Sequence, residues 1–537
     1  MIPSSPAKSS GKNGSAQEET VDFGEDFHYH PNTKSYSLEL RWKSLSVANQ
    51  LALGSTLLAT RLNLTTVNLA HTDFTPRGMQ QLASVLSVST TITNLDIGHN
   101  KLGEEGAVAI GKALASNITL QHLNLEWNDI QDTGLKSIID ALVENKDSNL
   151  HSLDIHSNKI GPAGGKFLAD YLATDPSLRD INARFNPIGD EGARAILRSI
   201  LYNRTLHTVD LTRCDIGDDC LAGYATKQFF QEVPSPTTQT GKTISPSLHL
   251  LHLRLDQNRI GADGLRDLMS GLHNLMKGQK KGLLSTLGGD RHSADQNPSS
   301  LSISQNNTIA LNGHIPALEG IRAMVDYFCD PCCGFEKIEM SGCGLGDAGC
   351  DVFVKLFAGN RTVKEVDIGR NRLTNLSCHN IVDALAGNHS LVSLDLRANE
   401  FTEVSFAELI ETVEKTPTLR EIDLRGNPIR VDEEVQALLE RYPRAAERIH
   451  LKEKANDHAA SGQMTFSSKG TLYSSAIAKP APKKKMTAST PVLPTVVKNS
   501  EPQETASAAP AKTVTRNPKT QKKGKPTALS WIKSNKE

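Results

Sequence analysis

The chain has 537 residues, of which 38% are hydrophobic and 22% are charged, a composition typical of soluble globular proteins. No apolar run approaches the length of about 18 residues that a membrane span needs, and the N-terminus lacks the apolar core of a secretory signal. Eight cysteines are too few for a disulfide scaffold, so we expect a cytoplasmic protein without a membrane span. The net charge of −1 hides an acidic body and a basic tail, because residues 452–537 hold 16 Lys and Arg against 5 Asp and Glu.

The first 34 residues are polar, and we expect them to be a disordered N-terminal segment. Leu38, Leu40 and Leu45 follow with the spacing of a degenerate first repeat. We therefore place the start of the folded domain at residue 35.

A sequence repeat of about 28 residues fills the chain between this segment and the tail, and such self-similarity is the signature of a solenoid. Each copy carries three apolar residues at fixed offsets, then an Asn, a further apolar residue and a Gly, as in LQHLNLEWNDIQDTG. Eleven clear copies begin at Leu64, Ile92, Leu120, Leu150, Leu178, Leu206, Leu250, Phe335, Val363, Leu391 and Leu419.

The residue pattern within one copy predicts a strand followed by a helix. Leu123 and Leu125 are two residues apart, which indicates a short strand rather than a helical stripe, and the stretch after the Gly has helical spacing. The Asn lies at the turn that leaves the strand, where an inward side chain can satisfy buried backbone groups. This structural Asn position holds Asn100, Asn128, Asn158, Asn186, Asn258, Asn371, Asn399 and Asn427.

Two insertions interrupt the repeat, at about residues 231–247 and 278–297, and the second is expected to be disordered. Leu301, Ile303 and Asn306 then fit a second degenerate copy. Residues 435–451 are expected to form a closing helix, so that the repeat domain covers residues 35–451.

In these motifs the chain resembles the leucine-rich-repeat superfamily, and its ribonuclease-inhibitor-like class in particular. The resemblance implies an α/β solenoid, a horseshoe with parallel strands on its concave face and helices on its convex face. Because no repeat buries its apolar side alone, stability would come from the stacking of neighbours.

The residue between the second and third apolar positions should point outward from the concave face. It is acidic in seven of the eleven copies: Asp96, Asp154, Asp210, Glu339, Asp367, Asp395 and Asp423. With strands about 4.8 Å apart, these like charges would repel, and a basic partner would relieve the repulsion. The alternative is that Arg184, Arg397 and Arg425 neutralise them locally.

Aromatic residues gather just before the Asn position. His99, Trp127 and Phe185 should be partly exposed there, and Trp is enriched at binding hot spots. The alternative is that Trp127 packs on the loops of neighbouring repeats.

No cofactor is expected. The sequence Gly241–Thr243 lacks the preceding Gly of a phosphate-binding loop, because Pro236 stands there. Cys329, Cys332 and Cys333 provide three ligands, whereas a structural zinc site normally has four. We therefore expect free thiols, with metal binding as the alternative.

The tail, residues 452–537, is expected to be disordered and basic, with runs at 483–485 and 519–525. Such runs suit nuclear import, acidic protein tails or the chain's own concave face. Nucleic-acid recognition is disfavoured, because no aromatic residues alternate with the basic ones.

These observations predict a monomeric, non-enzymatic scaffold that binds a protein partner. The resemblance extends to intracellular proteins of the ribonuclease-inhibitor, tropomodulin and ciliary dynein-regulatory types, which implies a cytoskeletal or ciliary setting. The alternative is a Ran-type GTPase-activating protein, although the acidic segment and the SDNAFGP-like motif of that family are missing here, so no catalytic residue is assigned.

Overall fold

The computed structural model describes residues 23–59, 62–174, 177–224, 229, 250–285, 300–306, 315–330, 333 and 335–451. All of these residues lie within the first of two units, residues 1–459. The basic tail and the insertion at 231–247 lie outside the described residues.

The described residues form one sheet in which every strand pairs with the next strand along the chain. β1 pairs with β2 in antiparallel fashion, and all later pairs are parallel. The strands are β1 Phe27–His30, β2 Ser35–Glu39, β3 Leu64–Asn68, β4 Asn94–Asp96, β5 His122–Asn124, β6 Ser152–Asp154, β7 Asp180–Asn182, β8 Thr208–Asp210, β9 His252–Arg254, β10 Ser300–Ser302, β11 Lys337–Glu339, β12 Glu365–Asp367, β13 Ser393–Asp395, β14 Glu421–Asp423 and β15 Ile449–His450.

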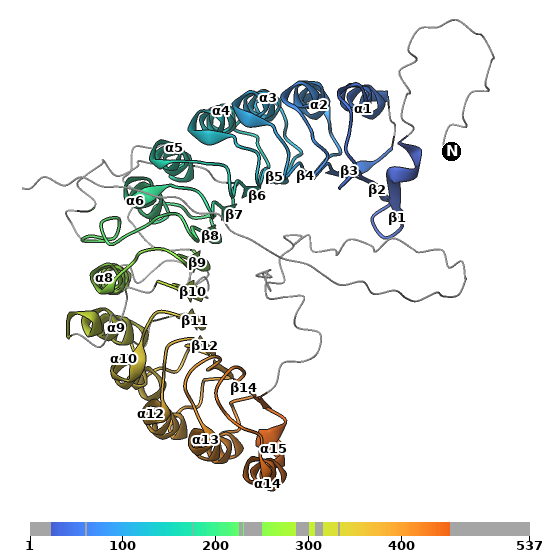
Figure 1. The fold of residues 1–537 in the computed structure, drawn as a ribbon. Coiled ribbons are helices and arrows are strands. Elements are labelled where there is room, and N and C mark those ends of the chain that lie inside the picture. The colour runs from blue at the N-terminus through green and yellow to red at the C-terminus, as the bar shows by residue number, and fades with distance from the viewer. Residues whose placement is uncertain are drawn as a thin grey trace, which may run out of the picture. The chain divides into compact units, whose positions relative to one another are not determined.

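The helices all lie on the outer side of the curved sheet, and the strands line its inner side (Figure 1). After a 3-10 helix at Gly24–Asp26, they are α1 Val47–Ala59, α2 Pro76–Val88, α3 Gly103–Leu114, α4 Gln131–Glu144, α5 Pro162–Leu172, α6 Gly189–Ser199, α8 Ala262–Ser285, α9 Ile315–Phe328, α10 Gly346–Phe353, α11 Lys355–Gly359, α12 Asn375–Ala386, α13 Glu403–Lys415, α14 Glu433–Arg441 and α15 Pro443–Ala446. The prediction of an α/β solenoid with parallel inner strands and outer helices is confirmed.

The register of the sheet follows the sequence repeat. Leu95 of β4 pairs with Leu123 of β5, and Leu123 pairs with Leu153 of β6, so equivalent residues stand side by side. These central leucines are at most 2% exposed, because each points away from the concave face toward the helices. Stacking of neighbouring repeats therefore buries what no single repeat could bury.

The structural Asn position forms a buried ladder of hydrogen bonds between repeats. The Asn158 amide donates to the carbonyl oxygens of Leu125 and Ile155, at 2.8 and 3.0 Å. Its Oδ1 accepts the backbone N–H groups of Asn128 and Ile130 in the preceding repeat. One side chain thus satisfies buried backbone groups on both sides of a repeat boundary.

A second Asn ladder, which the sequence analysis does not identify, stands at the ends of the helices. Each of its amides donates to a carbonyl of the preceding repeat at 2.6 to 2.7 Å. Its members are Asn117, Asn145, Asn203, Asn360 and Asn388. These five repeats are therefore joined to their neighbours at the helix ends as well as at the strand exits.

The structure differs from the expected boundaries at three places. The segment expected to be disordered up to residue 34 contains β1, which caps the edge of the sheet, and a buried Phe23. The insertion expected from residue 278 is helical up to Ser285, because α8 continues through Gln and Lys residues that favour helix. The expected single closing helix is broken at Pro443, which begins α15, and is followed by β15.

Candidate functional site

The acidic column consists of the outward residues in the last strand position of β11 to β14. Its members are Glu339, Asp367, Asp395 and Asp423, which are paired in register from strand to strand. The earlier acidic residues do not form such a run. Asp96, Asp154 and Asp210 alternate with Asn124 and Asn182, so their carboxylates stand two strands apart.

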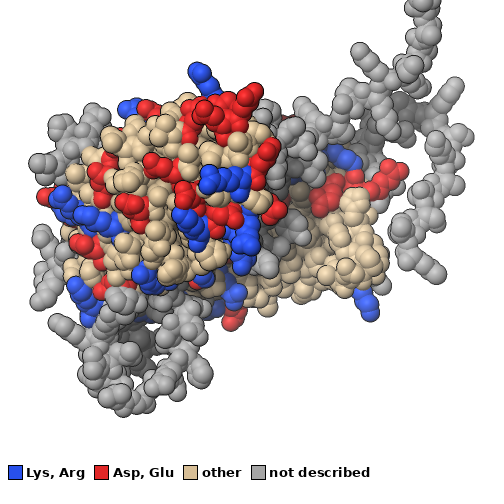
Figure 2. Space-filling view, turned by 90° about the horizontal axis from the view of Figure 1, so that it is seen from below, with Lys and Arg blue, Asp and Glu red and all other residues tan. Residues whose placement is uncertain are grey.

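Basic side chains stand between the members of the acidic column. The Arg397 guanidinium lies 2.7 Å from Asp395, 3.9 Å from Asp367 and 3.8 Å from Asp423. Arg425 pairs with Asp423 at 2.7 Å, and Lys337 pairs with Glu339 at 3.1 Å. Figure 2, seen from the end that carries α14 and α15, shows both signs of charge on that end of the solenoid.

The pairing does not fully compensate the carboxylates. Burial and then the charge of the neighbouring Asp395 raise the pKa of Asp367 to about 7, against the opposing effects of the Gly369 N–H and Arg397. Burial also raises the pKa of Asp395. Burial therefore disfavours the ionised form of Asp367 and Asp395, although both lie close to the Arg397 guanidinium.

Asp367→Asn is expected to stabilise the protein at pH 8 by about 1 to 2 kcal/mol. A carboxyl whose pKa is raised in the folded state contributes stability below its unfolded pKa, and that contribution is lost as the pH rises through about 7. Asn keeps the oxygen that accepts the Gly369 N–H at 2.9 Å. Urea unfolding at pH 5 and pH 8 measures the difference, which should grow with pH.

The matched control is Asp383→Asn, because that carboxylate on α12 is 70% exposed. The control should leave the unfolding free energy unchanged at both pH values. A variant at Asp367 that is no more stable than the wild type at pH 8 would show that the ionised carboxylate is adequately compensated.

An aromatic stack runs along the edge of the concave face where the strands end. Trp42 stacks on His71 at 3.6 Å between ring centroids, His71 on His99 at 4.0 Å, and His99 on Trp127 at 5.5 Å, each with an interplanar angle of 15°. Trp42 and Trp127, at the two ends, are 57% and 55% exposed. Trp127 therefore stacks within its own edge column and leaves much of its indole to solvent.

The two histidines of the stack have lowered pKa values. Burial, followed by the charges of His71, His156 and Arg41, lowers the pKa of His99 to about 4. Burial and Arg41 lower the pKa of His71. The stack is therefore uncharged at neutral pH.

His99→Phe is expected to reduce the loss of stability between pH 6.5 and pH 4. A histidine with a lowered folded pKa contributes stability above its unfolded pKa of about 6.5, and that stability is lost as the pH falls through about 4. Phe keeps a ring in the stack and does not titrate. Thermal unfolding across this pH range tests the prediction, and equal slopes for the two proteins would contradict it.

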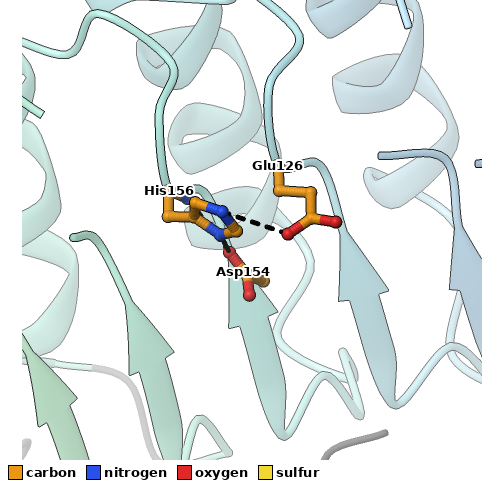
Figure 3. Close-up of side chains that lie close together, drawn as sticks. All are labelled: Glu126, Asp154 and His156. Carbon is orange, nitrogen blue, oxygen red and sulfur yellow. Dashed lines mark hydrogen bonds and ion pairs between the residues drawn. The ribbon is translucent and has the colours of Figure 1, made fainter. Parts of the chain in front are cut away.

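Next to the stack, His156 lies between two carboxylates from adjacent repeats (Figure 3). Its Nε2 is 3.1 Å from Glu126, and its Nδ1 is 2.8 Å from Asp154. The other Glu126 oxygen faces His99 Nε2 at 3.5 Å, which links this cluster to the stack. Desolvation raises the pKa of Glu126, with the charges of Asp154 and Asp96 adding to the rise and that of His156 opposing it.

The same three residues offer ligand atoms within 4.8 Å of one another. However, Glu126 and Asp154 contact opposite nitrogens of one imidazole, so the three do not converge on one ion position. Each ring nitrogen of His156 thus contacts a carboxylate, so neither contacts a hydroxyl or thiol that it could activate as a nucleophile. The cluster thus joins two adjacent repeats on the concave surface.

The cysteines of the described residues are free thiols. Cys214 and Cys343 occupy the structural Asn position and donate to carbonyl oxygens of the preceding repeat at 3.3 and 3.2 Å. Burial raises the pKa of Cys333 to about 12 and also raises that of Cys329, so both side chains are protonated thiols at neutral pH. Cys332 lies outside the described residues.

Several residues of this surface are missing from the sequence-based prediction. Trp42 begins the stack, and Glu126 and His156 form the carboxylate–imidazole cluster. A signal for Trp42 exists, since it follows Leu40 by two residues just as Trp127 follows Leu125. Phe185, which the sequence places in the same series, is separated from Trp127 by Ser157 and contacts Arg184 and Arg213 instead.

Among the described residues, no helix combines the length and apolarity that a membrane crossing requires. The profile of the Leucine Rich repeat family matches residues 62–83, 88–111, 116–138, 146–169, 174–197, 202–221 and 247–269.

The curated proteins similar to this chain include two from mouse. NACHT, LRR and PYD domains-containing protein 14 is 24% identical over 44% of this chain and 22% of its own length. Ribonuclease inhibitor is 22% identical over 39% of this chain and 43% of its own length. The chain thus spans less than half of either relative.

Among solved structures, Leiomodin-1 Actin-Binding Site 2 is matched with a TM-score of 0.22 at 13% identity, over 28% of this chain and 83% of that one. The in-register repeats, the Asn ladder and the matched profile agree with one another. The matched profile shows that residues 62–269 carry leucine-rich repeats, and over part of its length the chain is similar to mouse ribonuclease inhibitor.

Proposed function

We propose that this chain is a non-enzymatic scaffold whose concave face binds a basic segment of a protein partner. The observation that carries the proposal is the sharing of one guanidinium, that of Arg397, by Asp367 and Asp395, while Arg397 also approaches Asp423, which has Arg425 as a second partner. A partner that brings further positive charge would compensate carboxylates that the chain itself leaves undercompensated.

The surroundings of the acidic column support the same conclusion. Glu365 and Glu421, in the first positions of β12 and β14, are both exposed on the same strands. Lys337 lies 3.4 Å from Glu365, but the same ammonium group also pairs with Glu339. The carboxylates of β11 to β14 thus outnumber the cations that contact them.

The repeat architecture supports a binding rather than a catalytic role. The carboxylate–imidazole cluster at His156 lacks a free ring nitrogen, as shown above. A rigid curved sheet instead offers a large surface on which several contacts act together. A cytoskeletal or ciliary setting, which the resemblance implies, belongs to this proposal.

A photo-cross-linking experiment tests whether partners bind on the concave face. A photoreactive phenylalanine analogue placed at Ser393 of β13 should capture a protein partner in cells, whereas the same analogue at Glu144, at the exposed end of α4, should not. Capture from Glu144 alone would contradict the proposal. The GTPase-activator alternative is tested separately with purified protein and a Ran-type GTPase, where unchanged GTP hydrolysis is expected.

A further inference from the structure

Two arginine side chains from adjacent repeats lie against the ring of Phe185, at the edge of the concave face just after β7 and β8 end. The guanidinium carbon of Arg213 is 5.3 Å from the ring centroid, and that of Arg184 is 5.7 Å from it. The Phe185 backbone N–H donates to the Thr212 carbonyl oxygen at 2.9 Å, which places Arg213 in the next repeat. Both Phe185 and Arg213 are exposed. We call Arg184, Phe185 and Arg213 the arginine–phenylalanine cluster.

Neither guanidinium of this cluster forms an ion pair or donates a hydrogen bond within the part of the chain that the structure describes. The Arg184 Nε is withdrawn from solvent and has no acceptor. Arg397 occupies the same position in its own repeat, where it pairs with Asp395, two residues earlier, at 2.7 Å. The residue two positions before Arg184 is the neutral Asn182. The repeat therefore supplies Arg184 with no carboxylate of its own.

The carboxylates around the cluster contact other groups; they are Glu126, Asp154, Asp210 and Asp215. The charge of Arg184 acts on Glu126, but the oxygens of that carboxylate lie 3.5 Å from His99 and 3.1 Å from His156. Asp154 pairs with His156 at 2.8 Å, and Asp210 lies 3.9 Å from Arg254. On the outer edge, Asp215 pairs with Arg259 at 2.8 Å. The two arginines are thus left without an ion-pair partner from the chain.

Contact with the ring leaves the donors of both arginines available. A guanidinium is attracted to an aromatic ring by its charge, and this contact uses none of its five N–H groups as a hydrogen-bond donor. Those N–H groups lie in one plane and match the two oxygens of a carboxylate. The Phe185 ring therefore orients two cations that can still bind an anion.

We propose that the arginine–phenylalanine cluster binds a short acidic segment of a protein partner. Its Asp or Glu carboxylates pair with the two guanidiniums, and the methylene groups of the same side chains contact the Phe185 ring, which is 39% exposed. The site has the opposite charge preference to the acidic column and lies on different repeats. It goes beyond the proposed basic contact and does not depend on it.

The surroundings favour carboxylates over a phosphate group. Glu126, Asp154 and Asp210 belong to the strands beside the cluster, and their negative charges repel a dianion more strongly than a single carboxylate. Two separate guanidiniums, each with one planar set of donors, also suit two carboxylates of a segment.

A fluorine label at Phe185 tests the site in the full-length protein. 4-Fluorophenylalanine incorporated at this position keeps the ring and gives one ¹⁹F resonance. Titration with acetyl-tetraglutamyl-amide at low ionic strength should shift this resonance saturably, whereas the neutral acetyl-tetraglutaminyl-amide should not. Added salt should weaken the response, because it screens exposed ion pairs. Since the label reports only on its own surroundings, binding of the acidic peptide to the basic tail is not counted.

The control label is 4-fluorophenylalanine at Tyr29, whose ring on β1 is 53% exposed and tilted against Tyr36. Its resonance should not respond to the acidic peptide. A response at Tyr29 equal to that at Phe185 would mean that the peptide binds without selecting the cluster, which would overturn the inference.

A charge-removing variant identifies the groups that bind. Arg184→Gln with Arg213→Gln should weaken the affinity for the acidic peptide, measured with the label at Phe185, at least about tenfold, because hydrogen bonds between charged groups are the stronger ones. The matched control is Arg370→Gln with Arg372→Gln, which removes the same charge from two exposed arginines farther along the same edge. The control should leave the affinity unchanged.

Three results would overturn the inference even if the variant did not fold, because they come from the protein with wild-type arginines. They are a label at Phe185 that does not respond to the acidic peptide, an equal response to the neutral peptide, and a stronger response to inorganic phosphate. Neutralising the acidic column should leave the response unchanged. A failure at this site therefore leaves the proposed function standing, and a failure of the proposed function leaves this site standing.

Discussion

Asn158→Ala is expected to lower the free energy of unfolding by about 3 to 4 kcal/mol, the largest stability effect of any single change considered for this chain. The side chain is fully buried and bridges two repeats, donating to Leu125 and Ile155 and accepting from Asn128. Alanine would leave these buried backbone groups without partners, at a cost of about 1 to 3 kcal/mol for each unsatisfied group, reduced by partial relaxation. Urea unfolding followed by circular dichroism measures the loss.

The control for this prediction is Asn63→Ala, because Asn63 is exposed and donates one hydrogen bond, to the Lys34 carbonyl oxygen. We expect a change below about 0.5 kcal/mol there. A similarly small effect at Asn158 would mean that the ladder is not a principal source of cohesion between repeats.

The sequence is sufficient to predict the fold because the apolar spacing and the period of the repeat determine its secondary structure and its register. Three apolar residues of which the last two are two positions apart can only serve a short strand, and a spacing of 28 residues brings Leu95 and Leu123 into register. The same reasoning identifies the Asn position, whose chemistry requires both a donor and an acceptor.

The ends of the solenoid could not be predicted in this way. β1 is antiparallel and falls outside the repeat period, and Pro443 divides the last helical stretch. The composition of residues 278–297 predicts a disordered insertion, whereas the helical backbone of α8 continues to Ser285.

The sequence predicts which charged residues lie on the concave surface, but it does not predict which of them form ion pairs. The sequence places Asp367, Asp395 and Asp423 in one column, and it names Arg397 and Arg425 as alternatives that could neutralise them. Only the structure shows that the long Arg397 side chain reaches three carboxylates at once. Likewise, the left-handed backbone that aligns the aromatic rings is not evident from residue type, because such residues are usually glycine or asparagine.

Neutralising the acidic column is expected to weaken partner binding without harming the fold. The variant Glu339→Gln, Asp367→Asn and Asp395→Asn removes three negative charges. Its amides can still accept the backbone N–H groups of Gly369 and Arg397, which the carboxylates accept at 2.9 Å.

Burial raises the pKa of Asp367 and Asp395, so their replacement should stabilise the fold at pH 8. Although burial opposes it, the charges of Lys337 and Arg254 lower the pKa of Glu339, so replacement of Glu339 should cost part of that gain. Urea unfolding of the variant at pH 8 checks that the fold is retained, so that a loss of binding is not confused with unfolding.

The most direct test starts from the partner that photo-cross-linking identifies. Calorimetry then measures the affinity of that free partner for three forms of the chain. The forms are the wild type, the concave triple variant and a control with the same change in charge on exposed helix positions, Glu105→Gln, Glu144→Gln and Glu440→Gln. We expect the concave variant to bind at least about tenfold more weakly, a loss of about 1.4 kcal/mol, with a shallower dependence on salt, and the control to bind as the wild type does. Equal affinities for the wild type and the concave variant would contradict the proposal that the acidic column binds a basic partner.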